Sequence, residues 1–414
     1  MELAQEKGLG LTVGNSTLDF RQIIAHKNEL VQTLRDGLIR SFEQQQIEVI
    51  RGTAKVVGAN EVEVKTAGGA VRKKAKYIVI ATGVQYKPLP PIGKDKTIPA
   101  SSSELLDFQE IPNSLLLIGN DYVTATFASI FADLGSKVTI LCPTPRLLPD
   151  FEEDVVDGLV EELGMVDVKV MTDVQVVGAS RTKVKYKGEK GDKDDKSEKG
   201  DKGGKADQIL EGSIVANLSD QAGNTDELGL EACGIAVKDG FVTVKNGFET
   251  SMPSIYAIGD VTSSPWRLSH KASEEGRILA DVLMGNKLSM NYTAIPKIVF
   301  SRPMVATVGM TETQLKDRKT THRVFRFPVA RNSFAHVFGE IGGMLKILAA
   351  PDTGTILGVS VIGIFATELI AECAIAIKEK MTVEQLARVP QVHPSIAELL
   401  KDAMYAFHNQ VEKE

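Results

Sequence analysis

Two short glycine motifs each follow an apolar run in this 414-residue sequence. Ala81-Thr82-Gly83 follows residues 76–80, and Gly259-Asp260 follows residues 254–258. Such runs are typical of strands buried in a parallel sheet, and open α/β sheets bind ligands at the carboxyl ends of their strands. Glycine lets backbone approach a ligand closely, and the Asp260 carboxylate can accept a ribose or ribityl hydroxyl. Either motif alone also fits an ordinary turn, but together they predict a nucleotide-type cofactor site.

The three cysteines form no recognisable motif. Cys142, Cys233 and Cys373 are far apart in the sequence and make neither a CxxC nor a CxxxxC pair. This spacing argues against a disulfide framework and against a structural zinc site. We therefore expect isolated, reduced and mostly buried thiols, and no metal site.

The elements that would position the first glycine motif begin with a helix. Residues 20–46 are expected to be helical because apolar residues recur there at three- and four-residue steps among charged ones. Short strands are expected at 47–50, 61–65 and 76–80. A proline-rich stretch at 88–91 then marks a crossover between domains.

A βαβ pattern lies between the two glycine motifs. A strand at 114–118, a turn at 119–121, a helix at 122–134 and a strand at 137–141 have about the length of a mononucleotide-binding unit. The chain then returns to a strand at 254–258 and a helix at 270–284. Residues 291–414 are expected to form a separate α+β domain, with strands at 297–300, 304–308, 344–349 and 354–362 and helices near 366–378 and 395–408.

Composition limits the partners and the compartment. The formal net charge is −6, so nothing global attracts the chain to nucleic acid or to an anionic membrane. No stretch approaches the ~20 apolar residues of a membrane span. Residues 1–7 look like neither a signal nor a transit peptide, so the chain as written is expected to be cytoplasmic, or mitochondrial if its true N-terminus is missing. Residues 187–205 contain no apolar residue and are expected to be a disordered insertion.

Six segments together resemble one family, the dihydrolipoamide dehydrogenase-like class I pyridine nucleotide-disulfide oxidoreductases. They are YIVIATG (77–83), the βαβ unit (114–141), ELGLEACGI (227–235), MPSIYAIGDVTSSPWRLSHKASEEG (252–276), IPKIVFSRPMVATVGMTE (295–312) and VPQVHPSIAELLKDA (389–403). Outside the insertion, the resemblance runs from about residue 20 to the C-terminus. It implies an α/β fold with two Rossmann-like dinucleotide-binding domains, the first truncated, and a C-terminal α+β dimerisation domain. The implied bounds are 1–112 and 241–290 for the FAD-binding domain, 113–240 for the NAD-binding-like domain and 291–414 for the dimerisation domain.

The resemblance also implies which residues bind the cofactors. Gly119 opens the loop that would receive NAD. The residues that would approach FAD are Thr82, Gly83, Gly259, Asp260, Leu268, Ser269 and His270.

The C-terminal segment carries the acid–base chemistry that the resemblance implies. His393-Pro394-Ser395 and Glu398 match the family's His-Pro-Thr-x-x-Glu pattern. In such enzymes the histidine is the acid/base for thiol–disulfide exchange, and the glutamate accepts its other ring N–H. Pro394 is expected in the first turn of the helix that presents Glu398. The dyad reaches into a partner's active site in relatives, which implies a homodimer, with a lipoyl-bearing protein as a further partner.

The sequence departs from the family at its start. A strand, a GxGxxG loop for the FAD pyrophosphate and a CxxxxC redox pair open the family pattern, and Met1 falls after all of them. Without that loop FAD lacks a pyrophosphate cradle. Without the cysteine pair there is no thiolate to attack a lipoamide disulfide.

The NAD-binding-like domain departs at three more places. Asp121 and Thr124 replace the second and third glycines of the GxGxxG loop. Cys142 stands where an acidic residue would bind the adenosine ribose. The family's Gly-Arg-x-Pro-Asn-Thr run appears as residues 218–225, without its Arg or Pro. These changes predict weak or absent NAD binding.

Two hypotheses from different classes follow. The chain is an FAD- and NAD-linked dihydrolipoamide dehydrogenase-like oxidoreductase whose N-terminal segment was lost from an incomplete gene model, with impaired chemistry in the chain as written. Alternatively, it is an inactive relative that acts as a structural or regulatory dimer partner. A glutathione-, mercuric- or quinone-type reductase is a third interpretation, and the lack of vicinal C-terminal cysteines disfavours the mercuric type.

Overall fold

The computed structural model describes residues 14, 17–188 and 207–411. Residues 189–205 of the predicted insertion lie outside the described residues. The chain divides into two compact units. The first unit comprises Met1–Ile24, Pro88–Ser219 and Thr293–Glu414, and the second comprises Ala25–Lys87 and Asp220–Tyr292.

The predicted N-terminal helix is present as α2 (Phe20–Gln44). Ile24 is its buried residue, whereas Leu34 is 74% exposed. The strand predicted at 47–50 is wrong, because these residues form no ladder in the described chain and Ile47 N–H instead donates to Phe42 O at the helix end. An apolar run alone does not make a strand, since a strand also needs a partner for its backbone.

The second unit contains the two strands that carry the glycine motifs. β4 (Ile78–Ile80) and β16 (Ile255–Ala257) pair in parallel, with Ile78 opposite Ile255. Their buried side chains pack with Val56, Val242 and other apolar residues in one core. The other elements of this unit are β1 (Thr53–Gly58), β2 (Glu61–Thr66), β3 (Gly69–Lys74), β5 (Val84–Tyr86), β13 (Gln221–Gly223), β14 (Val237–Lys238), β15 (Phe241–Val242), the short 3-10 helices η1 (Glu231–Cys233), η2 (Gly259–Val261) and η3 (Tyr292–Ala294, which begins in this unit), and α6 (Ser269–Leu283).

A four-stranded parallel sheet in the first unit contains the predicted βαβ pattern. Its strand order is β12-β6-β7-β8, and it is formed by β6 (Ser114–Ile118), β7 (Lys137–Leu141), β8 (Val168–Met171) and β12 (Ile214–Asn217). The associated helices are α3 (Ser102–Leu105), α4 (Tyr122–Asp133) and α5 (Glu153–Met165), and an antiparallel sheet is formed by β9 (Gln175–Ala179), β10 (Lys183–Lys187) and β11 (Gln208–Glu211). Residues 115–118 are all buried, which is why this strand is a continuous apolar run.

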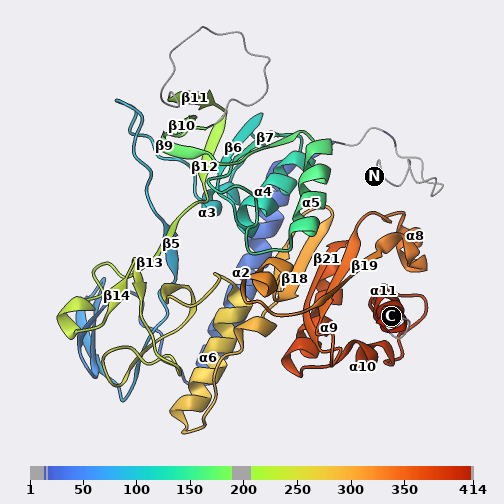
Figure 1. Ribbon diagram of the computed structural model, residues 1–414. Helices are drawn as coiled ribbons and strands as arrows, with labels where there is room; N and C mark the ends of the chain where they lie inside the picture. The colour runs from blue at the N-terminus through green and yellow to red at the C-terminus, as the bar shows by residue number, and fades with distance from the viewer. Residues whose placement is uncertain (1–13, 15–16, 189–206, 412–414) are drawn as a thin grey trace. The chain divides into compact units, whose positions relative to one another are not determined.

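The C-terminal part of the first unit is an α+β domain. Its antiparallel sheet has the order β17-β18-β21-β20-β19, and Figure 1 shows α9, α10 and α11 gathered beside these strands. The elements are β17 (Lys297–Val299), β18 (Met304–Gly309), α7 (Glu312–Asp317), β19 (Arg323–Pro328), η4 (Val329–Arg331), α8 (Ser333–Phe338), β20 (Met344–Ala349), β21 (Ile356–Gly363), α9 (Ala366–Lys378), α10 (Val383–Ala387) and α11 (Ala397–Val411). Most of these were predicted from the sequence, but β19 and the short helices α7, α8 and α10 were missed.

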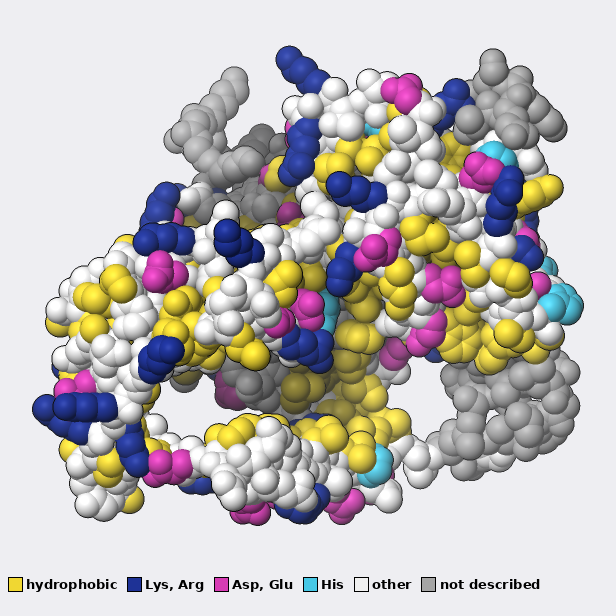
Figure 2. Space-filling model, turned by 90° about the horizontal axis from the view of Figure 1, so that it is seen from below, with side chains coloured by type: hydrophobic (Ala, Val, Ile, Leu, Met, Phe, Trp, Pro, Cys, Tyr) yellow, Lys and Arg dark blue, Asp and Glu magenta, His cyan; other side chains and the backbone are white. Residues whose placement is uncertain are grey.

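Surface features limit the kinds of partner. Among the described residues, no helix is both long and apolar enough to cross a membrane. On the face drawn in Figure 2, Lys and Arg side chains are interspersed with Asp, Glu and hydrophobic side chains, so this face presents no continuous basic patch. The expectation that nucleic acid is not a partner stays a prediction.

Candidate functional site

The two glycine motifs leave the sheet at the same end. β4 and β16 are parallel neighbours, and Ile258 N–H donates to Ile80 O at 3.0 Å just beyond the paired residues. Thr82-Gly83 and Gly259-Asp260 therefore emerge side by side at the carboxyl ends of adjacent strands. The sequence predicted this edge as a ligand site, and the topology brings the four residues together there.

Gly83 combines a backbone that favours glycine with open space. Its φ is +71°, and a Cβ built there would meet no atom within 4 Å. The Thr82 hydroxyl donates to Asn224 O at 2.8 Å, and its predicted contact with a cofactor stays a prediction. Asn224 Nδ2 donates in return to Thr82 O at 2.9 Å. Asn224 was missed as a supporting residue, although it lies in the 218–225 run that the sequence had singled out.

Gly259 is held by hydrogen bonds at both of its backbone polar groups. Its φ is +74°, its N–H donates to Glu275 Oε2 at 2.6 Å and its carbonyl accepts from Thr262 Oγ1 at 2.8 Å. Glu275 lies on the buried face of α6, so this helix fixes the glycine turn. The conformation favours glycine because a side chain is strained at such a positive φ.

Asp260 has an acceptor atom that the described protein does not use. Its Oδ1 is buried and has no hydrogen-bond partner among the described residues, although Lys271 Nζ lies 3.8 Å away. Burial raises the pKa of Asp260, and the nearby cationic groups of Lys271 and Arg267 oppose that rise. An orphaned acceptor at a strand end suits a ligand hydroxyl.

The other predicted cofactor residues lie at the start of α6. Leu268 is buried and precedes the helix, whereas Ser269 and His270 are exposed in its first turn. The predicted approach of these three residues to FAD stays a prediction.

The loop after β6 is closed by its own side chains. Asp121 is the N-cap of α4, and its Oδ1 accepts from Thr124 N and Thr124 Oγ1, each at 2.9 Å. A Cβ at Gly119 would collide with Thr124 Oγ1 and Leu218 O. The two residues that replace family glycines thus bond to each other and fill the space beside Gly119. They also use backbone N–H groups that a phosphate would bind at a helix N-terminus.

The segment after β7 is hydrogen-bonded to the loop after β6. Asn120 Nδ2 donates to Thr144 Oγ1 at 3.0 Å, and Leu148 N–H donates to Asn120 O at 2.7 Å. Cys142 lies within hydrogen-bonding distance of Thr144 Oγ1 at 3.3 Å. Asn120 and Cys142 are therefore occupied by contacts within the protein.

His393 and Glu398 form the dyad that the sequence predicted. His393 Nδ1 lies 2.9 Å from Glu398 Oε1 and 3.1 Å from Oε2, and Ser395 N–H donates to the same carboxylate at 3.1 Å. The hydrogen bonds from His393 and Ser395 hold the pKa of Glu398 below its usual range. The prediction for Pro394 was wrong, because α11 begins at Ala397 and Pro394 lies before it.

The His393 side chain is 75% exposed, whereas that of Glu398 is 20% exposed. The carboxylate is fixed by the first turn of α11 and the ring faces outward. This arrangement fits a proton-transfer group whose substrate comes from outside the described part of the chain.

Replacing His393 with Ala is expected to raise the pKa of Glu398 toward its ordinary value, because the largest stabilising hydrogen bond to the carboxylate is lost. The carboxyl ¹³C chemical shift, followed against pH, measures this change. His336→Ala is the control, since that ring bonds to Ala330 O. An unchanged Glu398 titration would show that the dyad is not formed in solution.

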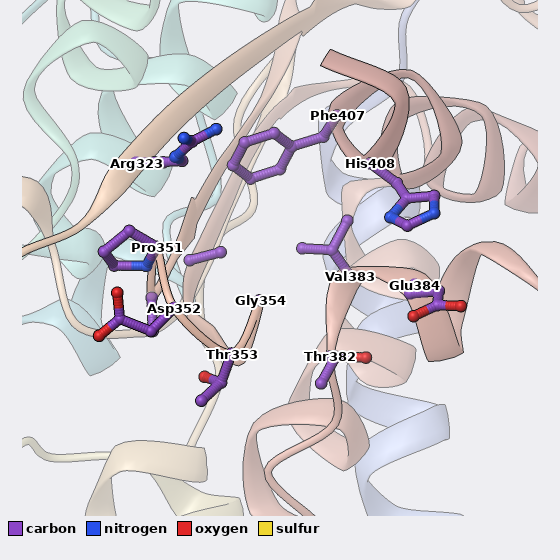
Figure 3. Close-up of a pocket in the computed structure, with 12 residues that line it drawn as sticks. Arg323, Pro351, Asp352, Thr353, Gly354, Thr382, Val383, Glu384, Phe407 and His408 are labelled. Atoms are coloured by element: carbon purple, nitrogen blue, oxygen red, sulfur yellow. The ribbon is translucent and has the colours of Figure 1, made fainter. Parts of the chain in front are cut away.

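A pocket of about 210 Å³ lies elsewhere in the C-terminal domain. Figure 3 shows Arg323, Asp352, Glu384, Phe407 and His408 among the side chains around it. None of the sequence-predicted site residues lines this pocket.

A cluster of charged side chains joins β20 to α5 and α7 within the first unit. Lys346 is 1% exposed, and its Nζ donates to Glu152 at 2.8 Å and to Asp154 and Glu312 at 2.7 Å each. The three carboxylates could hold a metal ion by geometry, but the lysine ammonium bonds to all of them. Burial opposes protonation, yet these carboxylates raise the pKa of Lys346.

Comparison with known proteins gives two family matches. Residues 6–276 match the model described as pyridine nucleotide-disulphide oxidoreductase, and residues 295–404 match that family's dimerisation domain.

Curated relatives are similar over nearly the whole chain. Dihydrolipoyl dehydrogenase 1, mitochondrial, from Arabidopsis thaliana is 32% identical over 97% of this chain and 78% of its own length. Dihydrolipoyl dehydrogenase from Geobacillus stearothermophilus is 32% identical over 95% of this chain and 82% of its own length.

Solved structures share the fold. LpdA from Mycobacterium tuberculosis has a TM-score of 0.83 at 24% identity, covering 98% of this chain and 86% of its own. The HOCl-induced flavoprotein disulfide reductase RclA from Escherichia coli has a TM-score of 0.81 at 27% identity, covering 97% and 88%.

Proposed function

The chain belongs to the pyridine nucleotide-disulphide oxidoreductases of the dihydrolipoyl dehydrogenase-like type, and on that premise we propose that it is a flavoprotein oxidoreductase. In this proposal the chain keeps its flavin edge, which is formed by Thr82, Gly83, Gly259 and Asp260 at the ends of β4 and β16. It also keeps the acid–base dyad, but its binding of NAD is impaired. The observation that carries the retained chemistry is the hydrogen bond between His393 and Glu398. The observation that carries the impairment is the closure of the Gly119 loop by Asp121 and Thr124.

The residues at the β4–β16 edge fit FAD. Asp260 has the orphaned acceptor that a ribityl or ribose hydroxyl would satisfy, and Gly83 leaves open space for close approach. FAD, when bound, supplies the electron-transfer chemistry. The chain's part would be to orient it: the backbone at Gly83 and Gly259 would lie close to FAD, and Asp260 would accept a hydrogen bond from one of its hydroxyls. Leu268, Ser269 and His270 would complete the edge at the start of α6.

The residues at the Gly119 loop do not fit a dinucleotide pyrophosphate. Asp121 would place a carboxylate against the phosphates, and Thr124 occupies the space that glycine leaves for close helix–strand packing. We therefore derive no hydride-transfer step from NADH or NADPH for this chain.

His393 would act in thiol–disulfide exchange. Glu398 fixes Nδ1, so Nε2 is the ring nitrogen that holds or releases a proton. The dimerisation-domain match suggests a homodimer, and the outward-facing ring suits a site completed by the partner subunit. A lipoyl-bearing protein is the substrate-side partner in this proposal. We assign residues 1–112 and 241–290 to the FAD-binding domain, 113–240 to the NAD-binding-like domain and 291–414 to the dimerisation domain.

A second candidate function is a catalytically inactive dimer partner. The same closed Gly119 loop favours it. An inactive subunit would keep the dimerisation domain, whereas the glycines of its nucleotide-binding loop would no longer be maintained by selection.

A visible absorption spectrum of the purified native protein tests the flavin half of the proposal. We expect a bound-flavin spectrum, because the residues of the β4–β16 edge fit FAD. A colourless protein that sediments as a folded dimer would overturn the flavoprotein assignment and favour the inactive dimer partner.

A further inference from the structure

Two fully buried charged residues lie on the packing face of α6. Lys271 and Glu275 are both 0% exposed, and Lys271 Nζ lies 3.5 Å from Glu275 Oε1. With Leu279 they are the buried residues of this helix, one turn apart. Apolar residues of the same size usually pack such a face at lower cost, because two charges must be taken out of water. The pair therefore has a role beyond packing.

Both residues are linked by hydrogen bonds to the backbone of Gly259. Glu275 accepts the Gly259 N–H at 2.6 Å. Lys271 donates to Ser264 Oγ at 2.9 Å, and the Ser264 and Thr262 hydroxyls are 2.7 Å apart. Thr262 Oγ1 in turn donates to Gly259 O at 2.8 Å. Glu275 thus fixes the Gly259 N–H directly, and Lys271 fixes the Gly259 carbonyl through the hydroxyls of Ser264 and Thr262.

The same ammonium also lies close to the free acceptor of Asp260. Lys271 Nζ is 3.8 Å from Asp260 Oδ1, too far for a hydrogen bond but close enough for strong Coulomb attraction. The other ionisable groups that face this place are Arg267, Glu275 and Tyr292, whose hydroxyl donates to Glu275 Oε1 at 2.8 Å. Arg267 donates to the carbonyls of Ser264 and Trp266 and stacks over Phe241. Lys271 therefore supports the charge of Asp260 without using up its free acceptor.

We propose that Lys271 is a positioning residue for the flavin edge, which holds the Gly259–Asp260 turn and supports the negative charge of Asp260 so that this carboxylate can accept a sugar-alcohol hydroxyl of FAD. The inference rests on the proposed flavoprotein function. Lys271 acts through Asp260 and does not touch the cofactor itself.

The test is a double-mutant cycle between Lys271 and Asp260, with FAD binding to the full chain measured by quenching of flavin fluorescence. Lys271→Met is expected to weaken FAD binding by about tenfold or more, which is the size of coupling seen between contacting groups. In the Asp260→Asn background the same change is expected to weaken binding by about threefold or less, because the carboxylate that Lys271 supports is gone and only its hydrogen bond to the Ser264 hydroxyl, which helps to hold the turn, is still lost. Equal losses in both backgrounds would overturn the proposal, since a purely structural lysine would act equally with either residue.

Two further measurements keep the result interpretable. Lys271→Met leaves Glu275 as an uncompensated buried charge, so if that variant does not fold, Lys271→Met/Glu275→Gln replaces it; the Gln carbonyl can still accept the Gly259 N–H. Arg277→Met is the matched control on the same helix, where the side chain is 78% exposed.

A ligand-free readout separates this proposal from the flavin assignment. If the wild-type chain does not bind FAD, the flavoprotein assignment fails, and the carboxyl ¹³C titration of Asp260 decides the role of Lys271. The proposal requires the titration midpoint of Asp260 to rise when Lys271 is replaced and to stay fixed in Arg277→Met. An unmoved midpoint in both variants would overturn it.

Discussion

Purified native protein supplied with limiting NADH and with lipoamide is expected to turn over at least about tenfold more slowly than an active dihydrolipoyl dehydrogenase assayed beside it, because each 1.4 kcal/mol of lost NADH binding costs a factor of ten. The structural reason is the closed loop after β6. Asp121 places a carboxylate at the helix N-terminus that would receive the pyrophosphate, and Thr124 fills the space beside Gly119. Steady-state loss of NADH absorbance measures the rate.

The same explanation makes a prediction in the opposite direction. Asp121→Gly/Thr124→Gly is expected to bind NADH about tenfold or more tightly than wild type, since each 1.4 kcal/mol regained is a factor of ten. It should also lose about 1 kcal/mol of stability with the N-cap of α4. Asp133→Asn removes one carboxylate from the same helix at an exposed position and is the control for net charge. Wild-type turnover within tenfold of the active enzyme would refute the impairment.

Lys346→Met is expected to lower the free energy of unfolding by about 3–5 kcal/mol, because it removes the buried cation that three carboxylates share. Asp154 keeps its ion pair with Arg326, and Glu312 keeps its ion pair with Lys316. Most of this loss comes from Glu152, whose side chain is 2% exposed, since water cannot replace the ammonium as the partner of its carboxylate. Urea unfolding followed by circular dichroism measures the loss. Lys316→Met is the matched control: it also pairs with Glu312, but its side chain is 66% exposed, so we expect about 1 kcal/mol or less.

The same cluster predicts how stability depends on acid. Hydrogen bonds from Lys316 and Lys346 lower the pKa of Glu312 to about 2. Because the folded pKa lies below the unfolded value, this contribution is complete above pH 4.5 and is lost as the pH falls from 4.5 through 2. Either lysine variant should flatten this part of the profile. An identical acid profile in wild type and both variants would contradict the assignment.

The sequence by itself determined elements with a clear hydrophobic pattern and side-chain pairs that are close in the sequence. Residues 114–118 formed the predicted strand, and its last four side chains, at 115–118, are apolar and buried, which suits a sheet covered on both faces. The family resemblance likewise predicted the His393–Glu398 pair, whose partners are five residues apart and need only a local turn and one helix start to meet. Local patterns of this kind do not depend on the rest of the chain.

Only the tertiary structure decided what distant residues do to one another. Strand β19 was missed and residues 47–50 were wrongly predicted as a strand, because a strand is fixed by a backbone partner that can lie anywhere in the sequence. The sequence showed Asp121 and Thr124 only as replaced glycines, but the fold joins them in one hydrogen-bonded cap that closes the loop. The sequence did not predict that Lys271 and Lys346 would be buried in ion pairs. The residues around a lysine in the sequence do not say whether folding will bury its ammonium among carboxylates from other elements.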